Sequence, residues 1–135
     1  MSKVTDTVSV DDGSDIFQYL IAEKNKVLVV TLIGIMGARF EVEMLKCLRE
    51  LDTTDFGLAI VNMRDVSGCD NYAINFMAQL KKVLRKKSTD IAICGVRPSI
   101  KDFLLAQGVL SKTEIFNNVK DALLRYTSTS NKSAA

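Results

Sequence analysis

The sequence predicts a single α/β domain, with a mixed, mostly parallel β-sheet that opens on an antiparallel hairpin and carries helices mainly on one face. Two apolar runs rich in β-branched residues, Ile16–Ala22 and Val27–Ile33, are separated by only four residues, and so short a connection joins antiparallel strands. Two later apolar runs, Leu58–Met63 and Ile91–Val96, each follow an amphipathic helical pattern, which is typical of parallel β-α-β units. The predicted order is therefore β-β-α-β-α-β-α-β-α, and 135 residues suit one such domain.

Two amphipathic patterns predict helices that cover the sheet, because apolar residues recur at helical spacing with charged residues between them. Gly34 and Gly37 are expected to mark the loop before the first of these helices. The apolar face of the first helix is predicted to hold Phe40, Met44, Leu45, Cys47, Leu48 and Leu51, and that of the second Ala73, Phe76, Met77, Leu80, Val83 and Leu84.

Capping signals predict the last elements of the chain. Pro98 is favoured in the first turn of a helix, Ser99 and Asp102 fit a capping box, and Gly108 is expected to end this helix as a left-handed cap. A short strand over Thr113–Phe116 and a final helix through Tyr126, capped by Asn117 or Asn118, complete the domain.

The ends of the chain lack these patterns. Residues 1–14 are predicted to be a loose N-terminal arm, residues 15–126 the folded domain and residues 127–135 a disordered tail. The N-terminal residues lack the features of a secretory signal, and the longest apolar stretch, Val27–Ala38, is too short to cross a bilayer. Three scattered cysteines without a Cys-x-x-Cys pair favour a reduced, cytoplasmic protein.

Composition narrows the classes of function. The net charge of +2 gives no electrostatic case for binding nucleic acid. The sequence contains no histidine, which excludes Ser-His-Asp and Cys-His nucleophile systems and histidine metal sites. Without histidine or carboxylates paired at a recognisable spacing, no reaction centre is evident, so we expect neither an enzyme nor a resident cofactor or metal.

The best candidate site is the corner where the strand beginning at Leu58 leads into the second helix. In parallel sheets, ligands and partners usually bind at such strand-to-helix corners. Here a polar loop ends in Asp70 and Asn71 at the start of the helix, and Asp70 is expected to be the N-cap. The glycine-containing loop that ends at Arg39 lacks the spacing of a phosphate-binding loop.

An ordered set of segments resembles the STAS domains, a family that includes the bacterial anti-sigma-factor antagonists. Leu32–Met36 is similar to the family's strand with a Leu-x-Gly-x-Leu turn, and Val61–Asp70 to the strand and loop that end in the family's aspartate. Cys94–Ile100 resembles its Gly-hydrophobic-x-Pro corner, and Leu104–Val109 its Leu-x-x-x-Gly-Leu helix end. The resemblance covers residues 17–126 and implies a STAS-type domain. The Gly-Val-Arg-Pro sequence before Ser99 further resembles the scaffold proteins of stressosomes.

The resemblance implies a non-catalytic protein–protein interaction module of bacterial signalling, resembling an anti-sigma antagonist or a stressosome subunit. The partners of such a module would be a kinase-like anti-sigma factor or other STAS proteins. The resemblance leaves open whether the chain also forms a homo-oligomer. In the antagonists, a phosphorylatable Ser or Thr follows the loop aspartate. Here Asn71 follows Asp70, and Tyr72-Ala73 replaces the family's small pair, so the usual phosphorylation site is absent. We therefore expect a constitutive, unphosphorylated-like docking surface.

That surface is expected to consist of the corner, the helix that begins there and the neighbouring loop: Ser67, Asp70, Asn71, Tyr72, Asn75, Met36 and Arg39. Other readings stay open. Ser67 or Tyr72 would be a displaced phosphorylation site, or simply a turn residue and a packing aromatic. Cys69 would be a low-pKa redox thiol or a small filler. The lysines and Arg85 of residues 81–87 would bind an anion, or be a solvated helix end. A module that binds a nucleotide or lipid is the alternative function.

Overall fold

The computed structural model describes residues 16–54, 56–87 and 90–125. The predicted arm over 1–14, the tail over 127–135 and the predicted helix end at Tyr126 lie outside these residues. Five strands form one sheet in the order β2-β3-β4-β5-β6. The strands are β2 (Phe17–Lys24), β3 (Val27–Met36), β4 (Leu58–Cys69), β5 (Asp90–Cys94) and β6 (Ile115–Phe116).

The sheet is mixed, as predicted. β2 and β3 pair antiparallel through a two-residue turn, in which Asn25 and Lys26 adopt positive φ values of 54° and 65°. The β3–β4, β4–β5 and β5–β6 pairs are all parallel. The order of elements along the chain also follows the prediction, with a helix in each crossover and residues 119–125 helical at the end of the described chain.

The β3 and β4 strands extend beyond their predicted ends. The prediction of a loop from Gly34 and of a polar loop after Met63 was wrong, because the parallel ladder continues to the pair Met36 and Cys69. Gly34 makes this continuation geometrically feasible. It adopts a φ of 98°, the ladder shifts register next to it, and a Cβ there would lie 2.0 Å from the carbonyl oxygen of Ile16. Only glycine tolerates this combination of positive φ and close backbone approach.

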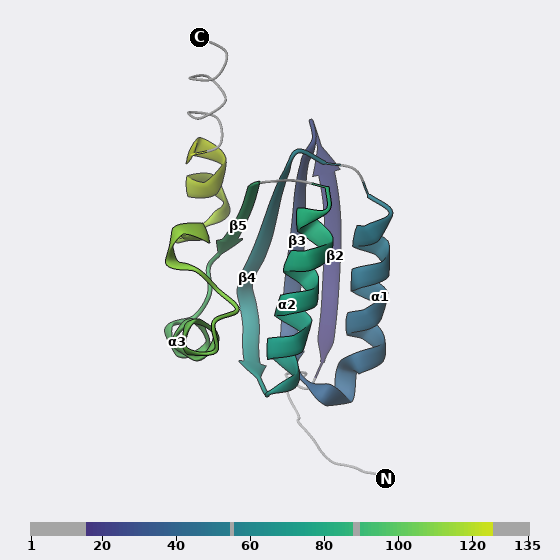
Figure 1. Cartoon of the computed structure of the whole chain (residues 1–135), viewed down its shortest axis with the longest axis vertical. Helices are drawn as coiled ribbons and strands as arrows, with labels where there is room; N and C mark the ends of the chain where they lie inside the picture. Colours follow the sequence, from purple (N-terminus) through teal and green to yellow (C-terminus); the bar gives the residue numbers. More distant parts are fainter. Residues whose placement is uncertain (1–15, 55, 88–89, 126–135) are drawn as a thin grey trace.

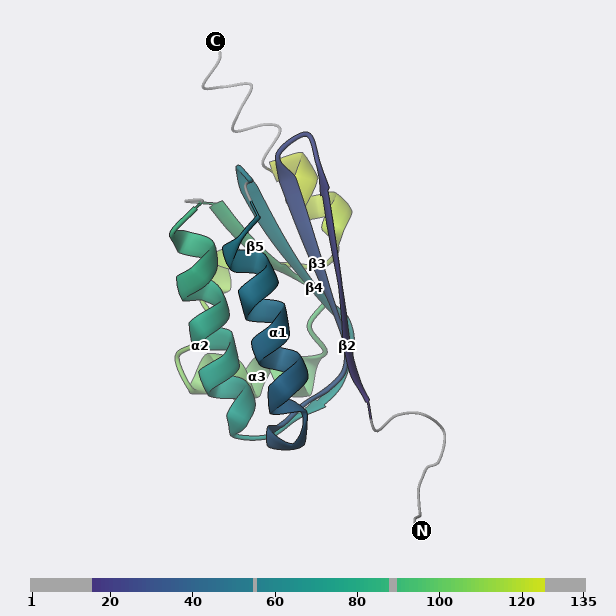
Figure 2. The same ribbon diagram turned by 90° about the vertical axis from the view of Figure 1, so that its right-hand side faces the viewer.

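The helices lie mainly on one face of the sheet (Figures 1 and 2). That face is covered by α1 (Glu41–Asp52) and α2 (Tyr72–Arg85), which follow the predicted helices closely. α3 (Pro98–Ala106) follows β5 at the end of the strand. The helix over 119–125 packs on the opposite face, where Ala122 joins a small buried cluster with Leu58 and Ile60.

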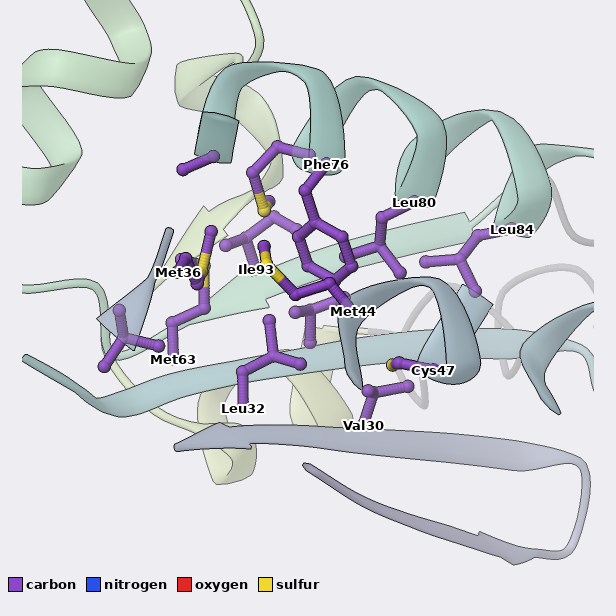
Figure 3. Packing of buried hydrophobic residues seen from close by; sticks show 14 of the residues in the cluster. Val30, Leu32, Met36, Met44, Cys47, Met63, Phe76, Leu80, Leu84 and Ile93 are labelled. Carbon is purple, nitrogen blue, oxygen red and sulfur yellow. The ribbon is translucent and has the colours of Figure 1, made fainter. Parts of the chain in front are cut away.

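The main core lies between the sheet and the pair α1–α2 (Figure 3). Each fully buried Val, Leu, Ile, Phe or Met side chain here gains roughly 1.5–3 kcal/mol from burial. Cys47 and Cys94 are buried as predicted, in the clusters on opposite faces of the sheet. Leu45 was wrongly assigned to the apolar face of α1: it is 41% exposed, because it projects sideways from the buried row of that helix. The largest fully buried side chains of this cluster include Leu28, Leu32, Met36, Met44, Leu51, Met63, Met77, Leu80, Leu84, Ile93 and Leu104.

The predicted capping box at Ser99 and Asp102 was wrong. Arg97 is the N-cap of α3, with extended backbone and no side-chain cap, and Ser99 already lies inside the helix. The physical reason is Pro98, which favours an extended conformation for the residue before it and so places the helix start at the proline itself. Gly108 has the predicted left-handed conformation, with a φ of 76°.

The strand before the last helix is shorter than the predicted Thr113–Phe116. Residues Lys112–Glu114 form a 3-10 helix, η3, and only Ile115 and Phe116 pair with β5. A capping box holds this turn, in which the backbone N–H of Ser111 donates to Glu114 Oε1 at 2.9 Å. Asn118, rather than Asn117, caps the last helix by accepting a 2.8 Å hydrogen bond from the backbone N–H of Asp121.

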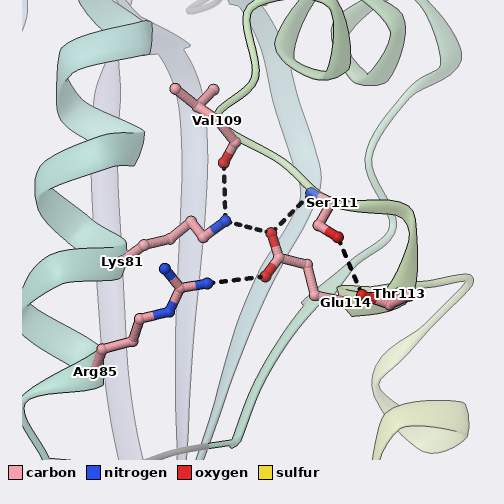
Figure 4. A network of polar contacts seen from close by, with 6 residues as sticks. All are labelled: Lys81, Arg85, Val109, Ser111, Thr113 and Glu114. Atoms are coloured by element: carbon pink, nitrogen blue, oxygen red, sulfur yellow. Dashed lines mark hydrogen bonds and ion pairs between the residues drawn. The ribbon is translucent and has the colours of Figure 1, made fainter.

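Lys81 is buried, whereas the basic residues at the end of α2 were predicted to be solvated. Its side chain is 11% exposed, and its Nζ contacts Glu114 Oε1 at 2.5 Å and the carbonyl oxygen of Val109 at 3.1 Å (Figure 4). Arg85 approaches the other carboxylate oxygen of Glu114 at 3.8 Å. The sequence pattern could not separate Lys81 from its basic neighbours, because its partner lies 33 residues away.

Candidate functional site

The predicted corner lies where two neighbouring parallel strands end and two helices begin (Figure 1). β3 ends at Met36 and is followed by a 3-10 turn, η2 (Ala38–Phe40), which leads directly into α1. β4 ends at Cys69, and Asp70 and Asn71 connect it to α2. Because parallel strands end at the same edge of a sheet, the starts of α1 and α2 lie side by side.

Asp70 joins the two halves of this corner. Its Oδ1 accepts a 2.8 Å hydrogen bond from the backbone N–H of Tyr72, and its Oδ2 accepts one of 3.1 Å from the N–H of Ala38. The first bond is N-cap geometry, because Asn71 already has helical angles of φ −61° and ψ −23°. Asp70 is therefore the geometric cap of α2, as predicted. Gly37 leaves room for the second bond, since a Cβ there would lie 3.1 Å from Asp70 Oδ2.

Asn71 presents an uncharged side chain at the start of α2. The residue is exposed, and its side chain makes no hydrogen bond to any residue of the described ranges. Its carbonyl oxygen accepts the backbone N–H of Ile74, so the backbone is already part of the helix. The position combines solvent access with the positive end of the α2 dipole.

Tyr72 connects the first turns of the two helices. Its hydroxyl donates a 3.1 Å hydrogen bond to Glu41 Oε2, at the first residue of α1. Burial, then the hydrogen bond and the negative charge of Glu41, raise the pKa of Tyr72 above its ordinary value. The phenol therefore stays protonated and acts as a donor at neutral pH. This contact orients the side chain of Glu41, a residue that the sequence reading did not single out.

The remaining predicted residues divide by exposure. Ser67, Asn75 and Arg39 are exposed, and the Arg39 guanidinium lies 5.1 Å from the ring centroid of Phe40. Met36 is fully buried, so its predicted place on the docking surface was wrong. The alternation of β3 points its side chain into the core, and only its carbonyl oxygen serves the corner, accepting the N–H of Asp70 at 3.2 Å.

Cys69 does not have the environment of a reactive thiol. Burial and then the Asp70 carboxylate raise the pKa of Cys69 above its ordinary value. The alternative of a low-pKa redox thiol therefore does not fit this position, because the neighbouring Asp70 charge is negative and the side chain is half-buried. A higher pKa leaves less thiolate at neutral pH, so the filler reading fits better than the redox reading.

Val42 is an exposed residue of the corner that the sequence reading missed. It is the second residue of α1, directly after Glu41, and is 71% exposed. Leu45, one turn further along α1, extends the same exposed apolar strip. A signal was present, because residues 42 and 45 fall out of phase with the buried row of Met44, Cys47 and Leu51.

The described residues were also compared with the requirements of a metal site and of a membrane-spanning helix. Among the described residues, no three His, Cys, Asp or Glu side chains come together as a metal site. Across the same part of the chain, every helix is too short or too polar to cross a membrane.

Comparison with known proteins shows which family and which solved structures this chain resembles. The model of the STAS domain family matches residues 19–122. No curated protein matches the sequence. An anti-sigma factor antagonist from Mycobacterium paratuberculosis has a similar structure, with a TM-score of 0.68 and 14% identity over 82% of this chain and 94% of that chain. A point variant of RsbS from Moorella thermoacetica gives a TM-score of 0.67 and 11% identity over 84% of this chain and 98% of that chain.

The same fold also occurs inside much larger proteins. The murine anion transporter Slc26a9 gives a TM-score of 0.66 and 19% identity, over 79% of this chain and 18% of that chain. This chain spans only 21% and 18% of the two SLC26A9 chains that it matches. At such low identities, these similarities describe the fold alone.

Proposed function

Since the chain belongs to the STAS domain family, we propose that it is a non-catalytic docking module of bacterial, cytoplasmic signalling, which binds a partner protein through the corner at the start of α2. The partner is a kinase-like anti-sigma factor or another STAS protein. The observation that carries this proposal is Asn71, an exposed and uncharged side chain at the start of α2, next to the aspartate that joins both helix starts.

The architecture of the corner supports a docking role. Asp70 and Tyr72 are occupied with internal hydrogen bonds, so they hold the surface in shape. Around this frame the exposed side chains of Asn71, Asn75 and Val42 combine hydrogen-bonding groups with an apolar contact. Rigid polar and apolar groups of this kind, presented at the surface, are typical of protein interfaces.

We propose that the charge at position 71 controls whether a partner can dock on this surface. A phosphate there would be well received by the start of α2, but it would bring nearly two negative charges beside Asp70 into the middle of the docking surface. Asparagine cannot accept this phosphate. We therefore propose that the chain keeps the docking-competent state permanently, unless another hydroxyl such as Ser67 or Tyr72 takes over the modification.

The proposal is tested by adding one charge at this position. Tagged wild type and Asn71→Asp are used to capture proteins from an extract of the source cell, and kinase-like anti-sigma factors and STAS proteins are quantified by mass spectrometry. We expect wild type to capture such a protein and Asn71→Asp to capture about tenfold less, the equivalent of roughly 1.4 kcal/mol of charge repulsion at the interface.

Asn117→Asp is the matched control, because it makes the same amide-to-carboxylate change at an exposed residue outside the corner. It should capture the same proteins as wild type. Equal capture by wild type and Asn71→Asp would move the interface away from the corner. Capture of neither protein class by wild type would contradict the proposed partners.

A further inference from the structure

A basic groove lies between α2 and the chain that follows α3. It has a volume of about 530 Å³ and is lined by Ala78, Lys81, Lys82, Arg85, Lys86, Gly108 and Val109. The lining therefore contains four cationic side chains and no acidic one. Ala78 and Gly108 carry little or no side chain, so the groove is open between its basic rim and Val109.

Buried polar contacts between α2 and residues 109–114 hold the wall of this groove in place. Lys81 Nζ contacts Glu114 and donates to the carbonyl oxygen of Val109, while the N–H of Ser111 binds the same carboxylate (Figure 4). The Glu114 side chain is 9% exposed, so its negative charge is turned away from solvent and shared with Lys81. These contacts hold residues 109–114 against α2 and use the charge of Lys81 internally.

The other three cations are more exposed than Lys81. Lys82 makes no ion pair or hydrogen bond with any residue in the described part of the chain. The side chain of Arg85 is 60% exposed and lies 3.8 Å from a carboxylate that Lys81 already binds more closely. Lys86 pairs with Asp52 at 3.4 Å, but both side chains are at least half exposed. Exposed pairs of this kind contribute little free energy, so another carboxylate can replace Asp52.

We propose that this basic groove binds an extended acidic segment of a partner protein, in which Asp or Glu side chains occupy alternate positions. Lys82 and Lys86 are one helical turn apart, a rise of about 6 Å along α2. Alternate residues of an extended chain are about 6.6 Å apart and point to the same side. Two carboxylates of such a segment therefore match Lys82 and Lys86, with Arg85 between them as a third donor. The segment's backbone lies over Ala78 and Gly108.

This interaction is separate from the proposed docking corner. The groove is lined by residues from the middle and last turns of α2, whereas Asn71 precedes its first turn. Binding of an acidic segment therefore does not require the corner to function, and the two proposals fail or succeed in different experiments.

The test uses the full chain and a fluorescein-labelled peptide of nine residues with glutamate at alternate positions. Fluorescence anisotropy should show saturable binding at low salt that weakens as salt is raised, because exposed charges are screened. The same peptide with glutamine in place of glutamate should not bind. Lys82→Gln/Lys86→Gln should weaken binding about tenfold, and Ala78→Leu, which fills an exposed position of the groove, should weaken it as well.

The double variant Lys24→Gln/Lys46→Gln is the matched control, since it removes the same net charge from exposed positions outside the groove. It should change the affinity by less than about twofold. Equal weakening by both double variants would overturn the proposal, because the attraction would then belong to the whole molecule. Binding of the glutamine peptide, absence of binding at low salt, or full displacement by equimolar phenyl phosphate would overturn it too.

Discussion

Asp70 uses its two carboxylate oxygens for two different parts of the chain. One oxygen caps α2 at Tyr72, and the other holds the N–H of Ala38 in the turn before α1. Each bond alone is an ordinary helix or loop contact. Together they hold the two helix starts close to each other, alongside the Tyr72–Glu41 hydrogen bond, and so help the exposed residues around Asp70 to present one common surface.

Removal of this side chain should cost stability as well as docking. We expect Asp70→Ala to lower the free energy of unfolding by about 1–2 kcal/mol, because the cap and the bond to Ala38 are lost together. Urea denaturation measures this loss. Asp65→Ala provides the comparison, since its exposed contact with Arg64, at 3.7 Å, should contribute less than about 0.5 kcal/mol. Equal losses in the two variants would show that Asp70 has no bridging role.

Cys47 should make stability depend on alkaline pH. Burial, and then the charge of Glu50, raise the pKa of this thiol from 9.0 to about 12. The unfolded chain therefore releases a proton near pH 9 that the folded chain keeps, and the stabilisation present below pH 9 is lost between about pH 9 and 12 at roughly 1.4 kcal/mol per pH unit.

Chemical denaturation under reducing conditions from pH 8 to 10.5 measures this dependence. Cys47→Ala lowers stability at every pH, but its stability should fall less steeply above pH 9, by about one proton's contribution. Buried Cys94, whose pKa is raised to about 11, remains in both proteins and contributes equally to both curves. Parallel curves for the two proteins would contradict the expectation.

At the scale of elements, α2 carries contacts of two kinds. Its first turn belongs to the corner, and its later turns hold residues 109–114 through Lys81. The buried pair of Lys81 and Glu114 joins elements that are not neighbours in the sheet, since η3 precedes the edge strand β6. This ion pair therefore connects α2 to the segment that leads into the edge strand, which also pairs with β5.

Breaking this pair from one side should be costly. We expect Lys81→Met to lower the free energy of unfolding by about 3 kcal/mol, because the buried Glu114 carboxylate loses its close cation and keeps only the exposed Arg85 at 3.8 Å. Lys81→Met/Glu114→Gln should recover more than half of this loss, since glutamine is neutral and can still accept the N–H of Ser111. Urea denaturation of the three proteins gives the comparison. A double variant no more stable than Lys81→Met would show that lost packing, rather than the unpaired charge, sets the cost.

At the scale of the whole molecule, the sequence predicted the order of elements and the mixed sheet, because hydrophobic periodicity and short connections are local properties. It did not predict features that depend on distant partners. The need for glycine at position 34 follows from the close approach of the Ile16 carbonyl oxygen, and the burial of Lys81 follows from its contact with Glu114. The burial of Met36 likewise depended on how far β3 extends, which the pattern around Gly34 hid.

For the candidate site too, local features could be predicted from the sequence, but features that depend on tertiary structure could not. The corner and the cap at Asp70 follow from the strand-to-helix pattern and from the preference of aspartate for N-caps. The bond from Asp70 to Ala38 and the exposure of Val42 do not, since they depend on how α1 and α2 lie beside each other. The sequence therefore predicted the corner as a structural feature, while the residues exposed around it required the tertiary structure.

The bridging carboxylate has a consequence for what a partner recognises. The two backbone groups that Asp70 binds belong to segments 32 and 2 residues away along the chain, so the surface around it is a discontinuous epitope. No short linear peptide from either segment reproduces it. Under the proposed docking role, an unfolded or proteolysed copy of the chain could not compete for the partner, and binding at the corner would report the concentration of intact, folded protein rather than of total polypeptide.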